Sequence, residues 1–140
     1  MTRIESSRLE YDAESARHTL DGVPFTGVVF SVWPNGQLES ESELRDGLNW
    51  GFSRSWHSTG AKLGEAEMRA GALHGRSREW HKNGQLASDG EHEYGITLWE
   101  RKWDENGTLL TDYELKPSDR QYHNLEKRRQ AYGRSDGSTG

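Results

Sequence analysis

The segment Trp80-His81-Lys82-Asn83-Gly84 decides the fold, because similar segments recur along the chain. The others are Trp33-Pro34-Asn35-Gly36, Trp56-His57-Ser58-Thr59-Gly60 and Trp103-Asp104-Glu105-Asn106-Gly107. The final glycines of the four segments are spaced by 24, 24 and 23 positions. A constant period of this size is typical of repeat proteins, in which each unit packs on its neighbours. We therefore expect function to reside on an extended surface.

A second set of glycines runs in phase with the first, at Gly22, Gly47, Gly71 and Gly95. Each repeat thus reads as a glycine turn, a short strand, an Asn-Gly or Thr-Gly turn and a second strand, which is a β-hairpin. The sequence predicts a mainly β protein: a single-layer, twisted antiparallel β-meander of about four 24-residue hairpin repeats with a C-terminal helix.

The repeats divide the chain into four parts. Residues 1–20 are a polar lead-in that could supply edge strands, and the hairpin array covers residues 21–115. Ser118 is a candidate N-cap for a helix within residues 116–132, which we expect to cap the open end of the sheet. Its apolar face would carry Tyr122, Leu125 and Tyr132. Residues 133–140 are expected to form a flexible tail.

The amino-acid composition limits which kinds of partner and which cellular compartment we expect. Hydrophobic residues make up only 31% of the chain, so stacking of repeats must supply most of the buried surface. The net charge of −5 argues against binding to nucleic acid or to anionic membranes and favours a basic partner. The chain has no cysteine, and it lacks a long apolar segment. We expect a soluble, cytoplasmic protein.

Acidic pairs recur five and seven residues after each turn glycine, at Glu41/Glu43, Glu65/Glu67, Asp89/Glu91 and Asp112/Glu114. Because strand side chains alternate between faces, each pair points to one side of the sheet. If each hairpin closes through a two-residue turn, Arg54, Arg78 and Arg101 lie opposite Glu65, Asp89 and Asp112, respectively. The opposite face would carry small residues such as Ser42, Ser53, Ala66 and Ser77.

The tryptophans before the turn glycines are interpreted as one repeat position: Trp33, Trp56, Trp80 and Trp103. Two roles are open for this stripe. The rings could stack from repeat to repeat as the core of the array, or they could contact a partner, since Trp and Arg are enriched in interface hot spots.

Catalytic and metal chemistry find little support in the residue pattern. His57 and His81 occupy equivalent positions about two strand spacings apart, too far for one zinc ion unless their side chains converge. Acid pairs that recur in every repeat are typical of a solvated, Arg-paired lattice, whereas an active site is a single asymmetric group of residues. We expect no metal, no cofactor and no enzymatic activity.

Three phrases carry a family resemblance: Asp46-Gly47-Leu48-Asn49-Trp50-Gly51, Ala72-Leu73-His74-Gly75-Arg76-Ser77-Arg78-Glu79-Trp80 and Asn83-Gly84-Gln85-Leu86. They resemble the bacterial variety of MORN repeats, and specifically the YwqK-type antitoxin family. The resemblance implies a role in a toxin–antitoxin system, as an antitoxin or immunity protein without catalytic residues. The His-Gly of the family pattern is intact only at His74-Gly75 and is lost in the fourth repeat, at Leu98-Trp99.

The leading hypothesis is a non-catalytic binding protein that neutralises a partner toxin, and the net charge of −5 favours a basic toxin. The predicted partner-binding residues are Trp56, Trp80, Arg54, Arg78, Glu65, Glu67, Asp89 and Glu91. The alternative is a self-associating scaffold of MORN type that forms a homodimer through its sheet edges. A small-molecule enzyme is a third, weaker alternative.

Overall fold

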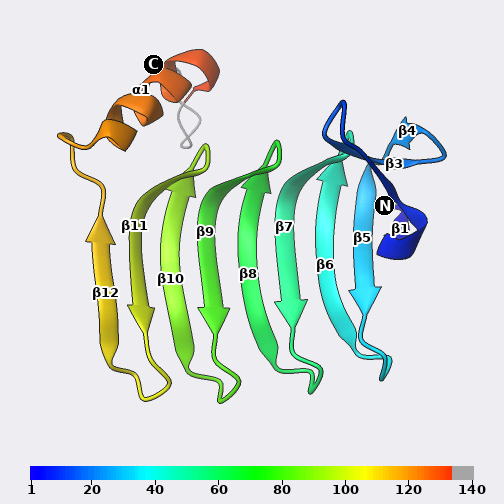
Figure 1. Cartoon of the computed structure of the whole chain (residues 1–140), viewed down its shortest axis with the longest axis horizontal. Helices are drawn as coiled ribbons and strands as arrows, with labels where there is room; N and C mark the ends of the chain where they lie inside the picture. Colours follow the sequence, from blue (N-terminus) through cyan, green and yellow to red (C-terminus); the bar gives the residue numbers. More distant parts are fainter. Residues whose placement is uncertain (134–140) are drawn as a thin grey trace.

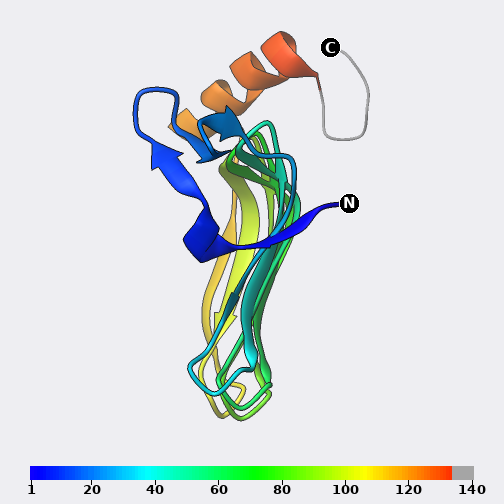
Figure 2. The same ribbon diagram turned by 90° about the vertical axis from the view of Figure 1, so that its right-hand side faces the viewer.

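The structure is a computed structural model that describes residues 1–133. In this part of the chain, nine strands form one twisted sheet in the order β1-β5-β6-β7-β8-β9-β10-β11-β12 (Figure 1). Seen from the side, the sheet is a single layer (Figure 2). The strands are β1 (Arg3–Glu5), β5 (Gly27–Val32), β6 (Leu38–Arg45), β7 (Leu48–Trp56), β8 (Lys62–Arg69), β9 (Ala72–Trp80), β10 (Leu86–Glu93), β11 (Ile96–Trp103) and β12 (Leu109–Glu114).

Consecutive strands from β5 to β12 pair antiparallel, so the predicted mainly β meander is confirmed. Strand β1 departs from this pattern because it pairs with β5 in parallel. At one end of the sheet, Asp46 and Gly47 both have positive φ, as do the equivalent residues of the other repeats. Positive φ at both central residues defines the two-residue turn that suits the right-handed twist of hairpin strands.

The turns at the other end of the sheet are looser than predicted. In the Gly60 hairpin, the His57 N–H donates to the Ala61 carbonyl at 2.8 Å, and the Gly60 N–H donates to the His57 carbonyl at 2.9 Å. The loop therefore has three residues, whereas we predicted two, which alone would shift the pairing by one position. A β-bulge next to the turn reverses that shift, because Trp56 lies opposite Lys62 but Ser55 lies opposite Gly64.

The same bulge recurs beside the other three turns of this type. The predicted turn was thus wrong, but the predicted register is confirmed: Arg54 lies opposite Glu65, and the Arg78/Asp89 and Arg101/Asp112 pairs follow the same rule.

The first residues form the N-terminal end of the sheet. After β1 come a 3-10 turn, η1 (Ser6–Arg8), and a small three-stranded sheet of β2 (Glu10–Asp12), β3 (Arg17–Leu20) and β4 (Val23–Pro24). Ile4, Phe25 and Leu44 are buried together here. Burial of apolar side chains is therefore concentrated at this end, while the middle strands carry mostly half-buried residues.

The helix α1 (Arg120–Tyr132) begins one residue later than predicted, since Asp119 is its N-cap in place of Ser118. Asp119 accepts a hydrogen bond from the Lys116 N–H at 2.9 Å, so its side chain stabilises the preceding turn and not the helix N–H groups. Of its predicted apolar face, Leu125 is 1% exposed and Tyr132 is 70% exposed.

We expected the helix to cap the open end of the sheet. It lies instead across the turns at one end of the strands (Figures 1 and 2). Arg128 donates to the Tyr94 carbonyl, and Arg129 pairs with Glu93. Both contacts join α1 to the β10–β11 turn. The predicted tail lies, beyond Gly133, outside the described residues. Among those residues, no helix is long and apolar enough to span a membrane.

Candidate protein-binding face

One face of the sheet, which we call the charged face, carries two rows of side chains that run across the strands. In the ion-pair row, each residue lies opposite the next on the neighbouring strand. The row alternates acid and base without interruption: Glu41, Arg54, Glu65, Arg78, Asp89, Arg101 and Asp112. The acidic row lies two residues along each strand: Glu43, Phe52, Glu67, Arg76, Glu91, Trp99 and Glu114.

Ion pairs link the ion-pair row across the strands. Arg78 Nε lies 3.4 Å from Asp89 Oδ1, and Arg101 Nε lies 3.3 Å from Asp112 Oδ1, so two of the three predicted pairs are confirmed. The third prediction was wrong in its partner. Arg54 lies opposite Glu65 but directs Nη1 to Glu41 Oε1, at 3.7 Å. Each arginine has an acid on both neighbouring strands, and Arg78 reaches both, since its Nη1 also lies 4.0 Å from Glu65 Oε1.

The acidic row holds more carboxylates than it can pair. Among the described residues, neither Glu43 nor Glu67 has a Lys or Arg nitrogen within 4.0 Å. The Glu67 carboxyl group packs directly on Gly75, where an added Cβ would meet its Oε2 at 2.5 Å. Glu43 lies in the same way on Gly51. These glycines are therefore needed for close approach of an acid, in addition to their positive φ.

The fourth repeat has Trp99 where the earlier repeats have this glycine. The Trp99 Nε1–H donates to Glu91 Oε2 at 3.0 Å, so the acid is held by an indole in place of a bare backbone. The residue that replaces the second glycine in this repeat thus makes a side-chain contact with the acid. Strands β10 and β11 correspondingly shift by one residue between Glu91 and His92.

Arg76 is the exception in the acidic row, because it reaches Asp89 in the other row. Its Nε and Nη2 each donate to one Asp89 oxygen at 2.7 Å. This bidentate bond holds the pKa of Asp89 below its ordinary value, and Arg78 adds to the effect. The carboxylate of Asp89 therefore stays ionised to a lower pH than an unpaired aspartate would.

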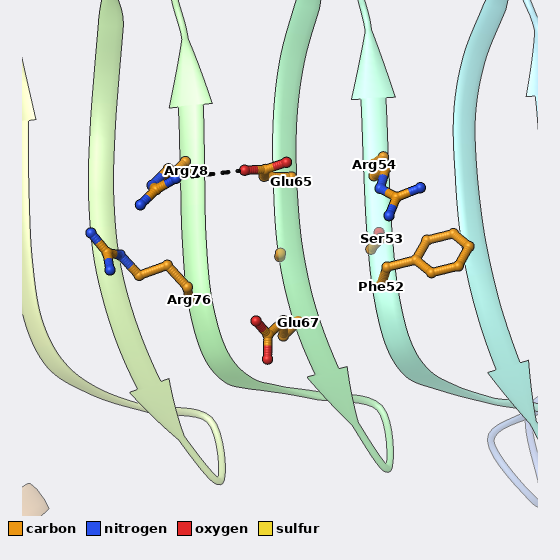
Figure 3. Close-up of a pocket in the computed structure, with 8 residues that line it drawn as sticks. Phe52, Ser53, Arg54, Glu65, Glu67, Arg76 and Arg78 are labelled. Atoms are coloured by element: carbon orange, nitrogen blue, oxygen red, sulfur yellow. Dashed lines mark ion pairs between the residues drawn. The ribbon is translucent and has the colours of Figure 1, made fainter.

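A pocket of about 460 Å³ opens at the centre of the charged face. Its lining residues are Phe52, Ser53, Arg54, Glu65, Ala66, Glu67, Arg76 and Arg78 (Figure 3). It brings together four of the eight predicted partner-binding residues, namely Arg54, Glu65, Glu67 and Arg78. Phe52 and Arg76 were missed by the sequence analysis. The spacing could have identified them, since both lie two residues before an arginine of the ion-pair row and therefore on the same face of the sheet.

The tryptophan stripe needs one correction. Trp33 is not equivalent to Trp56 and Trp80, because it precedes its turn glycine by three residues and they precede theirs by four. The structure gives Trp33 the role of the repeat histidines: its Nε1–H donates to the Trp56 carbonyl at 3.0 Å, and His81 Nε2 lies 2.9 Å from the Trp103 carbonyl.

Trp56 and Trp80 share the charged face with Arg54 and Arg78, two residues before them on uninterrupted strand segments. All six tryptophans of the chain are half-buried, so each keeps part of its surface exposed to solvent. Lys62 lies over the Trp80 ring, with Nζ 5.2 Å from its centroid. The same nitrogen is 2.5 Å from Glu65 Oε2, which joins the tryptophan to the ion-pair row.

The opposite face is different in character. Ser42 and Ser53 are hydrogen-bonded at 2.9 Å, and Ser77 lies in the same row of small residues. His92 is buried beneath this row, with Nε2 2.8 Å from Ser77 Oγ and Nδ1 3.1 Å from Thr97 Oγ1. Burial lowers the pKa of His92. Within the described residues, no group of three or more His, Cys, Asp or Glu side chains could hold a metal ion.

The repeated hairpin, the paired glycine turns and the charged face define a MORN-repeat protein, and the family model described as "MORN repeat variant" matches residues 25–46 and 73–93. The chain is also 42% identical, over 112 residues, to the immunity protein YwqK of Bacillus subtilis (strain 168). This similarity covers 80% of the chain and 73% of the relative. The chain therefore belongs to the YwqK family of MORN-repeat proteins.

Proposed function

We propose that this chain is a non-catalytic immunity protein that binds and neutralises a partner toxin with its charged face. The observation that carries the proposal is the similarity to a protein named an immunity protein, over most of both chains. Immunity by direct binding requires a surface and not an active site. A rigid sheet whose side chains repeat every hairpin supplies such a surface. A cytoplasmic site of action is part of the proposal.

The charge of the face supports a basic partner surface. The two rows carry eight carboxylates against four arginines. Charge complementarity of this kind speeds encounter and selects the partner, and it weakens as salt is added. Trp56 and Trp80 would supply apolar contact area beside the charges. The predicted contact set, Trp56, Trp80, Arg54, Arg78, Glu65, Glu67, Asp89 and Glu91, remains the proposed contact set, to which we add Phe52 and Arg76.

The test is co-purification of the tagged chain from its native host, followed by growth rescue with the protein that is recovered. The critical variant is Glu67→Gln/Glu91→Gln, which removes two charges from the acidic row without disturbing the ion-pair row. Its matched control is Glu79→Gln/Glu100→Gln, which removes two charges from residues that line a pocket on the opposite face. We expect the first variant to bind the partner about tenfold more weakly and the control to bind it normally.

Equal binding by both variants would exclude the charged face as the contact surface. Failure to recover a partner, or failure of the partner to inhibit growth, would overturn the immunity function itself. The alternative of a self-associating scaffold draws on the exposure of every residue of β12 at the sheet edge. Sedimentation velocity over a hundredfold range of concentration distinguishes it, because a scaffold of this kind would grow in mass while an immunity protein awaiting its toxin would not.

A further inference from the structure

The two edges of the sheet differ in how open they are. Strand β1 is a three-residue edge that pairs in parallel and runs directly into η1, which makes it a poor template for another strand. Strand β12, at the other edge, is a six-residue strand that pairs with β11 on its inner side, and all of its residues are exposed. In the described part of the chain, no strand pairs with its outer side (Figure 1).

The register identifies which backbone groups face outward from β12. The Leu115 N–H donates to the Leu98 carbonyl at 2.8 Å, on the same pairing line that sets Arg101 opposite Asp112. Hydrogen-bonded and non-hydrogen-bonded pairs alternate along an antiparallel ladder. The N–H and C=O groups of Asp112 and Glu114 therefore point away from β11, toward the open side.

The side chains of the same two residues belong to the charged face. Asp112 ends the ion-pair row and Glu114 ends the acidic row. Every earlier acidic strand is followed by a strand that sets an arginine opposite its first acid, namely Arg54, Arg78 or Arg101. Asp112 has Arg101 on its inner side and, within residues 1–133, no strand on its outer side. The alternation of acids and arginines in the ion-pair row thus ends on an acid, without an arginine of the described residues opposite its outer side.

The strands that continue the pattern within the molecule share a short motif. They read Phe52-Ser53-Arg54, Arg76-Ser77-Arg78 and Trp99-Glu100-Arg101. In each motif an aromatic residue or arginine lies in the acidic row, and an arginine lies in the ion-pair row two positions later. A strand added to β12 in the same antiparallel sense would meet Glu114 first and Asp112 second, as Trp99 and Arg101 do on the inner side.

We propose that the open edge of β12 receives an extended segment of the partner protein that carries an aromatic residue or arginine followed, two positions later, by an arginine. This inference rests on the proposed function, because it names the part of the toxin that docks. Backbone hydrogen bonds to Asp112 and Glu114 would hold the segment, and the two carboxylates would select its side chains.

A second copy of this chain fits the edge poorly. Residues 109–114 contain two acids and neither Lys nor Arg. Antiparallel pairing of two β12 strands that keeps the charged faces continuous would set Asp112 opposite a leucine, another Asp112 or Glu114. No such arrangement supplies the missing base, and like charges directly opposite each other are destabilising.

The experiment uses the full chain, labelled with nitrogen-15, and a synthetic linear peptide with the sequence of Arg76–Trp80, blocked at both ends. We expect saturable amide shifts concentrated on Asp112 and Glu114. The decisive control methylates the backbone nitrogens of the two peptide arginines, which should weaken binding at least tenfold because those N–H groups face β12. Methylation of the serine nitrogen between them should leave binding unchanged, because that N–H faces away.

Charge is tested separately from the backbone. A peptide with both arginines replaced by glutamate, and the protein variant Asp112→Asn/Glu114→Gln with the original peptide, should each bind at least tenfold more weakly. Equal affinity for both methylated peptides would overturn the inference, since attraction to the charged face alone would then explain binding. Absence of binding at millimolar peptide, or a dimer whose amide shifts map to β12, would also overturn it. None of these results depends on a toxin, so growth rescue remains an independent test of the proposed function.

Discussion

Replacement of Arg129 by alanine tests how α1 is attached to the sheet. Glu93 is 1% exposed and accepts two hydrogen bonds from the Arg129 guanidinium, at 2.5 and 2.9 Å. Removing one partner of a buried ion pair typically costs about 3–5 kcal/mol, because the other charge stays in a medium of low polarity. Arg129 keeps 19% of its side-chain surface in solvent, which favours the lower end of this range.

The helix can limit this loss by leaving the sheet, which would return Glu93 to water. Undocking gives up the burial of Leu125, about 1.5–3 kcal/mol, as well as the ion pair. Both routes lead to an expected destabilisation of about 3 kcal/mol. Urea unfolding measures the total, and hydrogen exchange of residues 120–132 shows whether the helix opens separately from the sheet.

The matched control is Arg128→Ala, at the neighbouring position. Arg128 donates to the Tyr94 carbonyl from an exposed position, so its removal changes the net charge equally but takes no hydrogen bond from a buried carboxylate. We expect a loss of about 1 kcal/mol. Equal losses for the two variants would refute the reasoning, because the effect of Arg129 would then be one of charge or helix propensity and not of the buried pair.

Three further outcomes are expected. Gly75→Ala should destabilise the fold by about 1–3 kcal/mol, since Gly75 has φ +122° and an added Cβ would strike Glu67. Gly64→Ala should cost less, because its Cβ would make ordinary contacts. Thermal unfolding of the two variants compares these losses. Ala70→Asn should stabilise by about 0.5–1 kcal/mol, because Ala70 holds a positive φ of 50° that asparagine tolerates better; a higher urea midpoint checks this. Burial lowers the folded-state pKa of His92. The neutral form's contribution to the free energy of unfolding should therefore be fully present above the unfolded-state pKa of about 6.5 and decrease as the pH drops below it. His92→Gln should flatten this dependence in urea midpoints measured from about pH 7.5 to 5.

Much of the array could be predicted from its period. Once the turn glycines were aligned, the alternation of strand faces placed Arg54 opposite Glu65 and Arg78 opposite Asp89 without any tertiary information. Which of two neighbouring acids an arginine contacts could not be predicted. Arg54 has carboxylates on both sides, and the choice depends on side-chain rotamers. Phe52 and Arg76 were missed for a different reason: they vary in type between repeats, so the pattern drew attention to the constant residues.

The ends of the chain were the least predictable part. Parallel pairing of β1 with β5 and burial of Ile4 against Phe25 join residues that are distant in sequence and share no repeat pattern. The helix was recognisable, but its place was not. The contact that fixes it pairs Arg129 with Glu93, and a buried acid in a chain rich in exposed acids has no distinctive sequence signal.

The bulge beside each three-residue loop has a consequence for how this protein can change in size. Because the bulge reverses the shift that the loop introduces, every hairpin ends in the register in which it began. Whole hairpins can therefore be gained or lost by duplication or deletion while acids and arginines stay opposite each other along the sheet. The length of the molecule's footprint can evolve separately from its chemistry, and a lineage could match a larger or smaller target by copying a unit it already has.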